Sequence, residues 1–379
     1  MDPQKQKSET HFEHYQNYSP GHPIRPSVKP TKTSAINSWL HKHRVVVLIL
    51  VLATAITLGG GIIYGFQTLE FYADGGTVTT KKVEKKIYSP LTGAETTEEF
   101  SKRPVTAIMI ENSPEARPQS GLKESGIVFE AIAEGGITRF LVLYQEDQPE
   151  LIGPVRSLRP YYVDWLAPFD PAVAHVGGSA KALAEIRNGD YKDIDQFFNA
   201  STYWRAKDRY APHNVYSSFS RIDELNEKKG FRSSSFTGFK RKDDAKKAVL
   251  NATTITVPIS GPLYNSSYAY DQTNGVYNRS QAGKPHLDRE KGAIAPKVVI
   301  VMQATLGKVF EDGYRENYQT TGSGPVTVFQ DGTAISGTWS KAGTKSQISF
   351  KDATGEEIEL NRGQTWITVI DTAKTPTWQ

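Results

Sequence analysis

Apolar positions follow two different patterns along this 379-residue chain. Residues 45–66 form 22 consecutive positions without a charged side chain, and a helix of that length spans roughly 30 Å of hydrocarbon. From residue 101 onward, the apolar residues come in short runs separated by turn-forming residues, which is typical of strands. The pattern therefore predicts one transmembrane helix followed by a strand-rich folded part.

The flanks of the apolar segment predict its orientation. The basic stretch HKHR at 41–44 precedes it and QTLE at 67–70 follows it, so we expect the N-terminus in the cytoplasm. No A-x-A pattern follows the segment, which favours a membrane anchor over a cleaved signal peptide. We expect a single-pass protein of the cell membrane whose C-terminal modules lie outside the cytoplasm.

Composition divides the chain into five segments. The first is polar and rich in proline and has no hydrophobic period, which predicts disorder, and a charged run over 238–253 marks a boundary inside the folded part. The expected organisation is a disordered cytoplasmic tail (1–44), the transmembrane helix (45–66), an extracytoplasmic stalk (67–100), an α/β module (101–240) and a β-rich module (241–379).

The two folded modules differ in their predicted secondary structure. In the first, strands alternate with helices, and two of the helices have N-cap and C-cap signals, Ser179 with Gly189 and Ser220 with Gly230. The predicted strands cover 105–110, 127–133, 137–144 and 172–176, and the predicted helices cover 161–169, 179–189 and 220–230. The second module contains short strands, with Asn274-Gly275 as a hairpin turn. The fold class is therefore α/β or α+β with a mixed sheet, joined to a mainly-β module that resembles a small sandwich or barrel.

Charge and cysteine content exclude several function classes. The chain has no cysteine, which excludes disulfides, cysteine-zinc sites and cysteine nucleophiles. Residues 1–44 contain seven Lys/Arg and three Asp/Glu, so 38 of each sign remain for the exported part, and a neutral surface does not predict nucleic-acid binding. The histidines lack the close spacing of metal ligands, so we expect neither a metal nor a cofactor.

The run FEAIAEGGITRFLVLY, 129–144, carries charges inside an apolar, strand-like segment. A two-residue hairpin about Gly135-Gly136 places Glu134 opposite Ile137 and Ile132 opposite Arg139. In that register Glu130, Glu134 and Arg139 share one face, while Phe129 and Phe140 share the other, which packs into the core. The charged face then either lines a pocket or forms a salt-bridged surface exposed to water.

Other polar residues gather at the predicted ends of strands, where mixed sheets usually bind ligands. Two glycines before Ser179 open a helix whose backbone N–H groups could face an anion, and arginines can clamp carboxylates or phosphates. No catalytic residue can be assigned from the sequence. The candidate ligand-binding residues are Glu111, Asn112, Arg117, Glu130, Glu134, Arg139, Arg156, Arg159, His175, Ser179, His213 and Asn214.

Several long motifs, in order, resemble the YerB-like family of bacterial envelope proteins, which is built on a domain of unknown function. The motifs are RPVTAIMIENSPEARPQSGL, IVFEAIAEGGITRFL, IGPVRSLRPYYVDWL, AHVGGS and RYAPHNVY, then YNRSQAGKPHLD, KVVIVM, GTWSK and TWITV. They cover about residues 100–375. Family members are often lipoproteins held by a lipidated cysteine, so the helix at 45–66 is expected to replace the lipid here. The resemblance implies location and architecture, and it brings no catalytic residue.

Three functions remain open. The first is an envelope protein whose N-terminal module binds a polar, anionic or carbohydrate-containing cell-wall ligand. The second is a cell-wall hydrolase that uses glutamate acid/base chemistry, and the third is a non-catalytic scaffold that binds an envelope protein partner. If Glu130, Glu134 and Arg139 converge in one cleft with Arg156 and with His175 or His213, a site is favoured. If they are scattered over exposed surface, the scaffold is favoured.

Overall fold

A computed structural model gives the structure of residues 85–308 and 315–379. The part from Lys86 to Gln379 is one compact unit. The predicted tail, the transmembrane segment 45–66 and most of the predicted stalk lie outside the described residues. Within the part of the chain that the structure describes, no helix has the length and hydrophobicity needed to span a membrane.

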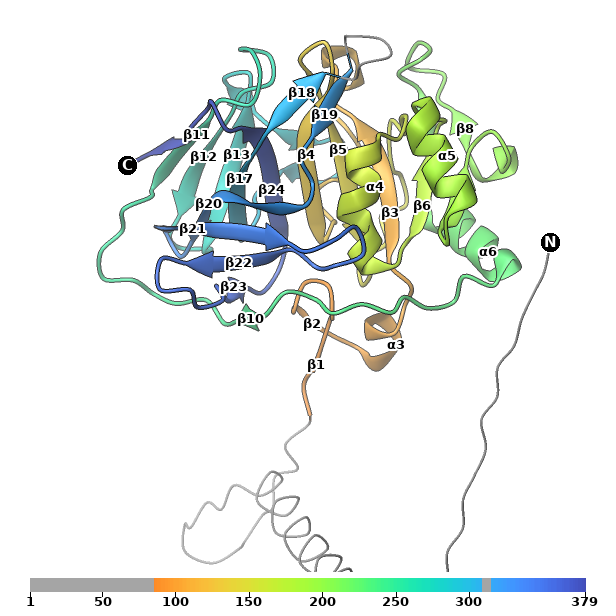
Figure 1. The fold of residues 1–379 in the computed structure, drawn as a ribbon. Helices are drawn as coiled ribbons and strands as arrows, with labels where there is room; N and C mark the ends of the chain where they lie inside the picture. Colours follow the sequence, from red (N-terminus) through yellow and green to blue (C-terminus); the bar gives the residue numbers. More distant parts are fainter. Residues whose placement is uncertain (1–84, 309–314) are drawn as a thin grey trace, which may run out of the picture. The chain divides into compact units, whose positions relative to one another are not determined.

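A mixed ten-stranded sheet is the framework of the described part (Figure 1). In spatial order, its strands are β22 (Ser349–Asp352), β21 (Thr333–Lys341), β20 (Gly322–Gln330), β17 (Val298–Ala304), β24 (Thr365–Asp371), β4 (Ile127–Glu134), β5 (Ile137–Tyr144), β3 (Thr106–Glu111), β6 (Ala172–His175) and β7 (Lys192–Asp195). The four strands predicted in the N-terminal module are β3 to β6. They join the C-terminal strands where β24 pairs in parallel with β4, with Ile367 beside Phe129.

A second, antiparallel sheet of five strands is built from the C-terminal half. Its order is β14 (Lys284–Pro285), β13 (Val276–Gln281), β12 (Ser266–Asp271), β11 (Thr254–Val257) and β25 (Thr377–Trp378). Gly275 ends the β12–β13 turn with φ +63°, in the left-handed region that the Asn-Gly signal predicts. The C-terminal strands thus divide between two sheets. They do not form the separate small sandwich or barrel that the sequence predicts.

Short two-stranded ladders cover the rims of the described part. They are β1 (Ile87–Tyr88) with β2 (Glu95–Thr96), β8 (Trp204–Arg205) with β9 (Val215–Tyr216), β10 (Arg241–Lys242) with β23 (Leu360–Asn361), β15 (Leu287–Asp288) with β16 (Gly292–Ala293), and β18 (Leu306–Lys308) with β19 (Glu316–Tyr318).

Three of the four helices in the described part lie close to their predicted positions, and the shortest begins in the segment expected to be a stalk and was not predicted. Among the described residues the helices are α3 (Glu98–Ser101), α4 (Pro160–Leu166), α5 (Ala180–Asn188) and α6 (Phe219–Lys229), with short 3-10 turns η1 (Pro114–Ala116), η2 (Ala167–Phe169) and η3 (Ala200–Thr202). Ser179 caps α5 as predicted, because its side chain accepts a hydrogen bond from the Ala182 N–H. For α6 the predicted cap, Ser220, is wrong by two residues, since Ser218 accepts the capping bond from Arg221 N–H.

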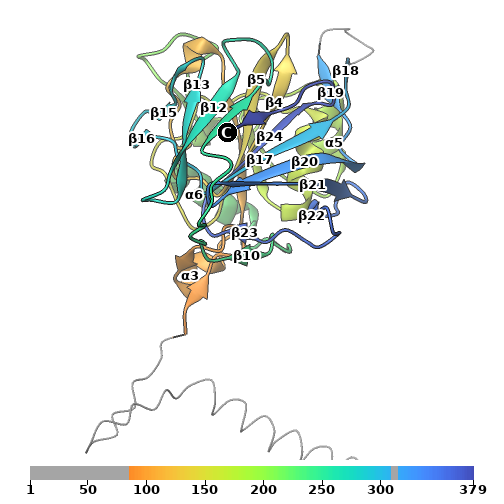
Figure 2. The same ribbon diagram turned by 90° about the vertical axis from the view of Figure 1, so that its left-hand side faces the viewer.

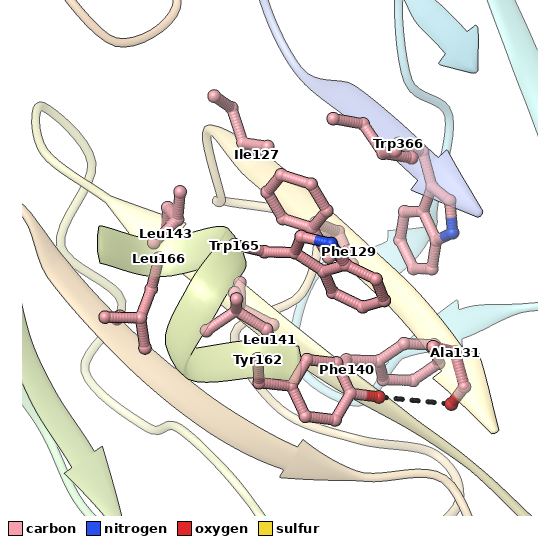
Figure 3. Close-up of a cluster of buried hydrophobic side chains, with 14 of the residues drawn as sticks. Ile127, Phe129, Ala131, Phe140, Leu141, Leu143, Tyr162, Trp165, Leu166 and Trp366 are labelled. Atoms are coloured by element: carbon pink, nitrogen blue, oxygen red, sulfur yellow. Dashed lines mark hydrogen bonds between the residues drawn. The ribbon is translucent and has the colours of Figure 1, made fainter. Parts of the chain in front are cut away.

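Both faces of the β4–β5 hairpin are buried. Helices α4 and α5 cover one face of the large sheet, and β12 and β13 lie on the other side (Figures 1 and 2). On the helical side Trp165 stacks on Phe129 with ring centroids 5.7 Å apart, and the Tyr162 hydroxyl donates to the Ala131 carbonyl (Figure 3). On the other side the rings of Phe140 and Trp366 meet edge to face at 5.3 Å. The hairpin is therefore a central element of the core.

The predicted hairpin register is right at the turn and wrong beyond it. Glu134 pairs with Ile137 as expected, but an irregularity between Ile132 and Glu134 puts Ile132 opposite Thr138 and Ala131 opposite Arg139. One extra residue in a strand reverses the alternation of side chains for all the pairs that follow. As a result Glu130 and Arg139 lie on opposite faces of the sheet, and the shared charged face does not form.

Candidate functional site

The predicted site residues lie mostly around the end of β3 and the β4–β5 turn. Glu111, the last residue of β3, is the cross-strand partner of Arg139 in β5. Most of these side chains are buried: Glu111, Glu130 and Arg139 are all less than 5% exposed. Neither alternative for the charged face is found: Glu130, Glu134 and Arg139 do not form an exposed salt-bridged surface, and they do not converge in one cleft. The predicted residues instead form three polar clusters near these strands and a fourth at the end of β6, and two of the residues line an open hollow.

The first cluster is centred on the Glu111 carboxylate. Its Oε1 accepts hydrogen bonds from Ser113 Oγ at 3.0 Å and from His213 Nδ1 at 2.9 Å, and Arg156 Nε lies 3.2 Å away. Its Oε2 is buried and makes no hydrogen bond among the described residues. Because a carboxylate accepts, Nδ1 of His213 carries the proton. Nε2 of His213, which has no hydrogen-bond partner in the described part of the chain, is then free to accept.

Asn112 connects this cluster to the core and to Arg117. Arg117 donates to the Asn112 side chain at 3.2 Å and to its backbone carbonyl at 2.8 Å, and the guanidinium lies 5.2 Å from the Tyr264 ring centroid. The Asn112 amide in turn donates to Thr138 Oγ1 at 2.6 Å and to Glu130 Oε1 at 3.5 Å. Burial lowers the pKa of Arg117, but a guanidinium keeps its charge at physiological pH.

Glu130 belongs to the second cluster, which is fully buried between the two sheets. Its Oε2 accepts from Arg279 of β13 at 2.7 Å and from the Trp366 indole at 3.0 Å, and both members of the ion pair are inaccessible to solvent. The Arg279 guanidinium also lies 4.4 Å from the centroid of the Trp366 ring. This pair joins strands of the N-terminal and C-terminal halves, and it leaves Glu130 unavailable to an external ligand.

His286 completes the second cluster in a neutral form. Arg279 donates to its Nδ1 at 2.7 Å, and its Nε2 lies 3.1 Å from Gln119 Oε1. Burial, followed by the nearby charges of Arg279 and Arg117, lowers the pKa of His286 well below its ordinary value. His286 is therefore a structural donor and acceptor inside the core.

Glu134, Arg139 and Arg159 form the third cluster. Glu134 accepts from Arg139 at 2.7 Å through Oε1 and from Arg159 at 2.5 Å through Oε2. Burial acts to raise the pKa of Glu134, but the two arginines outweigh it and the pKa is lowered. Because Arg139 also donates to the Ser157 carbonyl at 2.8 Å, this cluster fixes the hairpin turn against the chain leading into α4.

His175 and Ser179 lie in a separate cluster at the end of β6. His175 is fully buried, with Nε2 3.0 Å from Asp193 and Nδ1 2.8 Å from the Gly177 carbonyl. The Gly177 N–H donates to Asp195 Oδ1 at 3.0 Å. The glycine turn that could have received an external anion is thus occupied by a carboxylate of the chain itself, and Ser179 serves as the helix cap.

An open hollow of about 460 Å³, which we call the arginine hollow, lies beside the first cluster. Two predicted residues, Arg117 and His213, line it. The other lining residues were missed in the sequence, because they lie in a loop without periodicity or, in the case of Arg289, in the other half of the chain. They are Glu115, Pro118, Asp208, Arg209, Tyr210 and Arg289.

The arginines of the hollow are held in two different ways. Arg289 pairs with Asp208 at 2.5 Å. Arg209 donates instead to the backbone carbonyls of Glu115 at 2.8 Å and Pro118 at 2.5 Å, and Arg117 is held by Asn112. Three arginines and two carboxylates line the hollow, so 3 − 2 leaves one positive charge in excess. Arg117 and Arg209 are thus fixed in place by neutral oxygen atoms that do not cancel their charge.

Asn214 supports this hollow from behind. Its Nδ2 donates to the carbonyls of Ala206 at 3.1 Å and Arg209 at 3.2 Å, and its Oδ1 accepts from Arg205 at 2.7 Å. Asn214, one of the predicted binding residues, therefore holds the loop that carries Arg209.

Within residues 85–308 and 315–379, no group of three or more His, Cys, Asp or Glu side chains is placed to hold a metal ion.

Comparison with known proteins gives matches over both halves of the chain. Residues 91–232 match the N-terminal domain, and residues 255–367 the C-terminal domain, of the family described as a protein of unknown function, DUF3048. The chain is 34% identical over 296 residues to the putative lipoprotein YerB of Bacillus subtilis (strain 168), covering 76% of this chain and 87% of that protein. The crystal structure of B. subtilis YerB superposes with a TM-score of 0.69 at 30% identity, covering 77% of this chain and 100% of that one. The sequence matches and the structural match to YerB thus cover the same two modules of this chain.

Proposed function

The chain belongs to the YerB-like family with paired DUF3048 domains, and on this premise we propose that it is a membrane-anchored envelope protein that binds an anionic cell-wall ligand. Its B. subtilis relative is a putative lipoprotein. This chain has no cysteine to carry a lipid, so the apolar segment 45–66 would supply the anchor, with the described modules outside the cytoplasm.

The arginine hollow carries this proposal. Arg117 and Arg209 are held in place by neutral oxygen atoms, so both side chains are ordered and their charge is not cancelled. A planar guanidinium recognises a carboxylate or a phosphate with two parallel hydrogen bonds. Because the arginines are already ordered, less side-chain entropy is lost when a ligand binds.

Tyr210 supports a carbohydrate-containing ligand. It lines the hollow and is 92% exposed, so its ring is open to solvent beside the arginines. Aromatic rings bury large apolar area at low entropic cost, and a sugar ring bearing an anionic group could stack here while the charge reaches Arg209.

The two other functions have less support. Glu130 and Glu134 are both held by arginine partners, so neither is placed as a free acid or base for glycoside hydrolysis. A protein-interaction scaffold is kept as an outcome of the test below.

Calorimetric titration of the compact unit 86–379 tests the proposal. The ligands are a glycerol phosphate oligomer, a muropeptide with free carboxylates, and a neutral chitin tetrasaccharide. We expect the anionic ligands to bind and the neutral one to bind at least about tenfold more weakly, a difference of about 1.4 kcal/mol.

Variants identify the site. Arg209→Ala should weaken binding of the anionic ligands, whereas Arg232→Ala, which removes an exposed partner of Glu227, should leave it unchanged. Absence of binding by all three ligands would favour the scaffold. Binding that Arg209→Ala does not alter would place the ligand elsewhere.

A further inference from the structure

His213 has the surroundings of a general base, and we propose that the arginine hollow hydrolyses phosphodiester bonds with His213 accepting the proton of the attacking water. This inference rests on the proposed function, because the same hollow must first bind the anionic group. It adds a reaction and a substrate class to that binding site.

The Glu111 carboxylate orients the His213 imidazole. It is 3% exposed, accepts from Nδ1 at 2.9 Å, and is itself held by Ser113 at 3.0 Å and Arg156 at 3.2 Å. A buried carboxylate on Nδ1 fixes the tautomer and stabilises the imidazolium that forms when Nε2 takes a proton. Glu111 is thus a positioning residue, and His213 is the group that faces the hollow.

Water is the nucleophile in this arrangement. The hydroxyl that contacts His213 is that of Ser113, and it lies 3.2 Å from Nδ1, on the side of the ring that is turned toward Glu111. Nε2, which has no protein partner among the described residues, therefore has no side-chain hydroxyl to activate. In an open hollow, a solvent molecule can occupy that position.

The positive charge of the hollow favours a phosphodiester over a carboxyl-bearing peptide as the substrate. A phosphodiester carries its negative charge on the non-bridging oxygen atoms of the phosphorus that reacts, and cations placed beside those oxygens stabilise the transition state of phosphoryl transfer. Arg117 and Arg209 are positively charged groups held rigidly beside His213. A carboxyl-bearing peptide would place its charge away from the bond that breaks, so the same arginines would only bind it.

The reaction balances without any further reactant. His213 Nε2 takes a proton from water as the water oxygen bonds to phosphorus and the phosphorus–oxygen ester bond breaks. The leaving alkoxide takes a proton from solvent on the opposite side, and the imidazolium returns its proton to solvent. The products are one phosphate monoester and one alcohol.

The test measures hydrolysis by the unit 86–379 of bis(4-nitrophenyl) phosphate and of a glycerol phosphate oligomer, with EDTA present to inhibit contaminating metal-dependent phosphodiesterases. His213→Asn should lower kcat by about 100-fold or more, the usual contribution of a general base, and leave oligomer binding within threefold. Glu111→Gln should lower kcat with KM unchanged, whereas Arg209→Ala should both raise KM and lower kcat, because it removes a charge that holds the substrate and stabilises the transition state. Arg232→Ala is the matched control outside the site, and hydrolysis in ¹⁸O-labelled water should place the label in the phosphate product.

The outcomes separate the two proposals. Binding without hydrolysis overturns this inference and leaves the proposed function in place, as does hydrolysis that His213→Asn does not slow. Absence of both binding and hydrolysis removes both proposals. If His213→Asn does not fold, His213→Gln and Glu111→Gln are compared instead, and an unchanged kcat in a folded member of that pair overturns the inference.

Discussion

Buried charges are the residue-scale feature that most distinguishes this protein. The Glu130–Arg279 pair is closed to solvent on both sides, and desolvation of two charges is repaid only when their geometry and remaining hydrogen bonds are satisfied. The indole of Trp366 and the imidazole of His286 supply those bonds. Removing one member therefore leaves a charge without compensation in the core.

Glu130→Gln should lower the free energy of unfolding by about 3–5 kcal/mol, the range for breaking a buried ion pair from one side. Urea denaturation measures it. Glu95→Gln, which breaks the exposed pair with Lys86, should leave the urea midpoint unchanged. A Glu130→Gln midpoint equal to that of the wild type would contradict the account of this cluster.

A second residue-scale prediction concerns Lys341, which is 1% exposed and donates to the carbonyls of Gly343 and Thr344. Burial lowers its pKa to about 8 from an ordinary 10.5, against the opposing charge of Asp164. Between these two values the unfolded chain binds more protons than the folded one, so the free energy of unfolding should rise as pH increases from about 8 to about 10.5. A tenfold difference in proton affinity corresponds to about 1.4 kcal/mol, so the rise should not exceed a few kcal/mol.

Lys341→Met should abolish that rise. Thermal or urea unfolding of both proteins across this pH range provides the measurement. If the free energy of unfolding rises equally with pH in the wild type and the variant, titratable groups other than Lys341 produce the rise.

At the scale of elements, the sequence predicts more of the strands and helices than of their pairing. Strands β3 to β6 and helix α5 lie where local periodicity and caps place them, because those signals are carried by neighbouring residues. The irregularity between Ile132 and Glu134 carries no such signal, because both faces of the hairpin are buried and the alternation of apolar and polar residues therefore does not specify the register there. One extra residue was therefore enough to separate Glu130 from Arg139.

The turn of that hairpin offers a matched pair of substitutions. Gly135 and Gly136 have φ values of +57° and +80°, where a side chain costs about 1–2 kcal/mol. A Cβ on Gly136 would also lie 2.8 Å from Ser260 Oγ, whereas one on Gly135 meets nothing within 4 Å. Gly136→Ala should thus destabilise the protein more than Gly135→Ala in urea denaturation, and the reverse order would contradict this description of the turn.

The candidate site could be predicted only in part, because local sequence signals do not show which distant residues the fold brings together. Glu111, Arg156 and His213 were expected near strand ends, and the structure brings them together in one cluster. Arg289 comes from the other half of the chain, so no local pattern relates it to His213. Arg209 lies four residues before His213 in the motif RYAPHNVY, but a loop without periodicity does not indicate that the two side chains face the same hollow. His175 looked equivalent to His213 in the sequence, but Asp193 and Asp195 close around it in the fold.

At the scale of the whole described unit, the two halves share one sheet. Strand β24 pairs with β4 in parallel, and Arg279 of β13 reaches Glu130 of β4. A fragment spanning 86–240 would lose the strand beside β4 and leave Glu130 buried without its partner. We expect that fragment to stay unfolded or to aggregate, while 86–379 unfolds in one cooperative transition. Calorimetry distinguishes these results, and a fragment with its own cooperative transition would contradict the expectation.

The most direct test of the central claim is the nitrogen NMR spectrum of the histidine side chains during titration with a glycerol phosphate oligomer. The account predicts that neutral His213 carries its proton on Nδ1, and that its Nε2 signal shifts saturably as the oligomer binds, while His175 and His286, both buried, keep theirs. A His213 protonated on Nε2, or one whose signals do not respond to the oligomer, would contradict it.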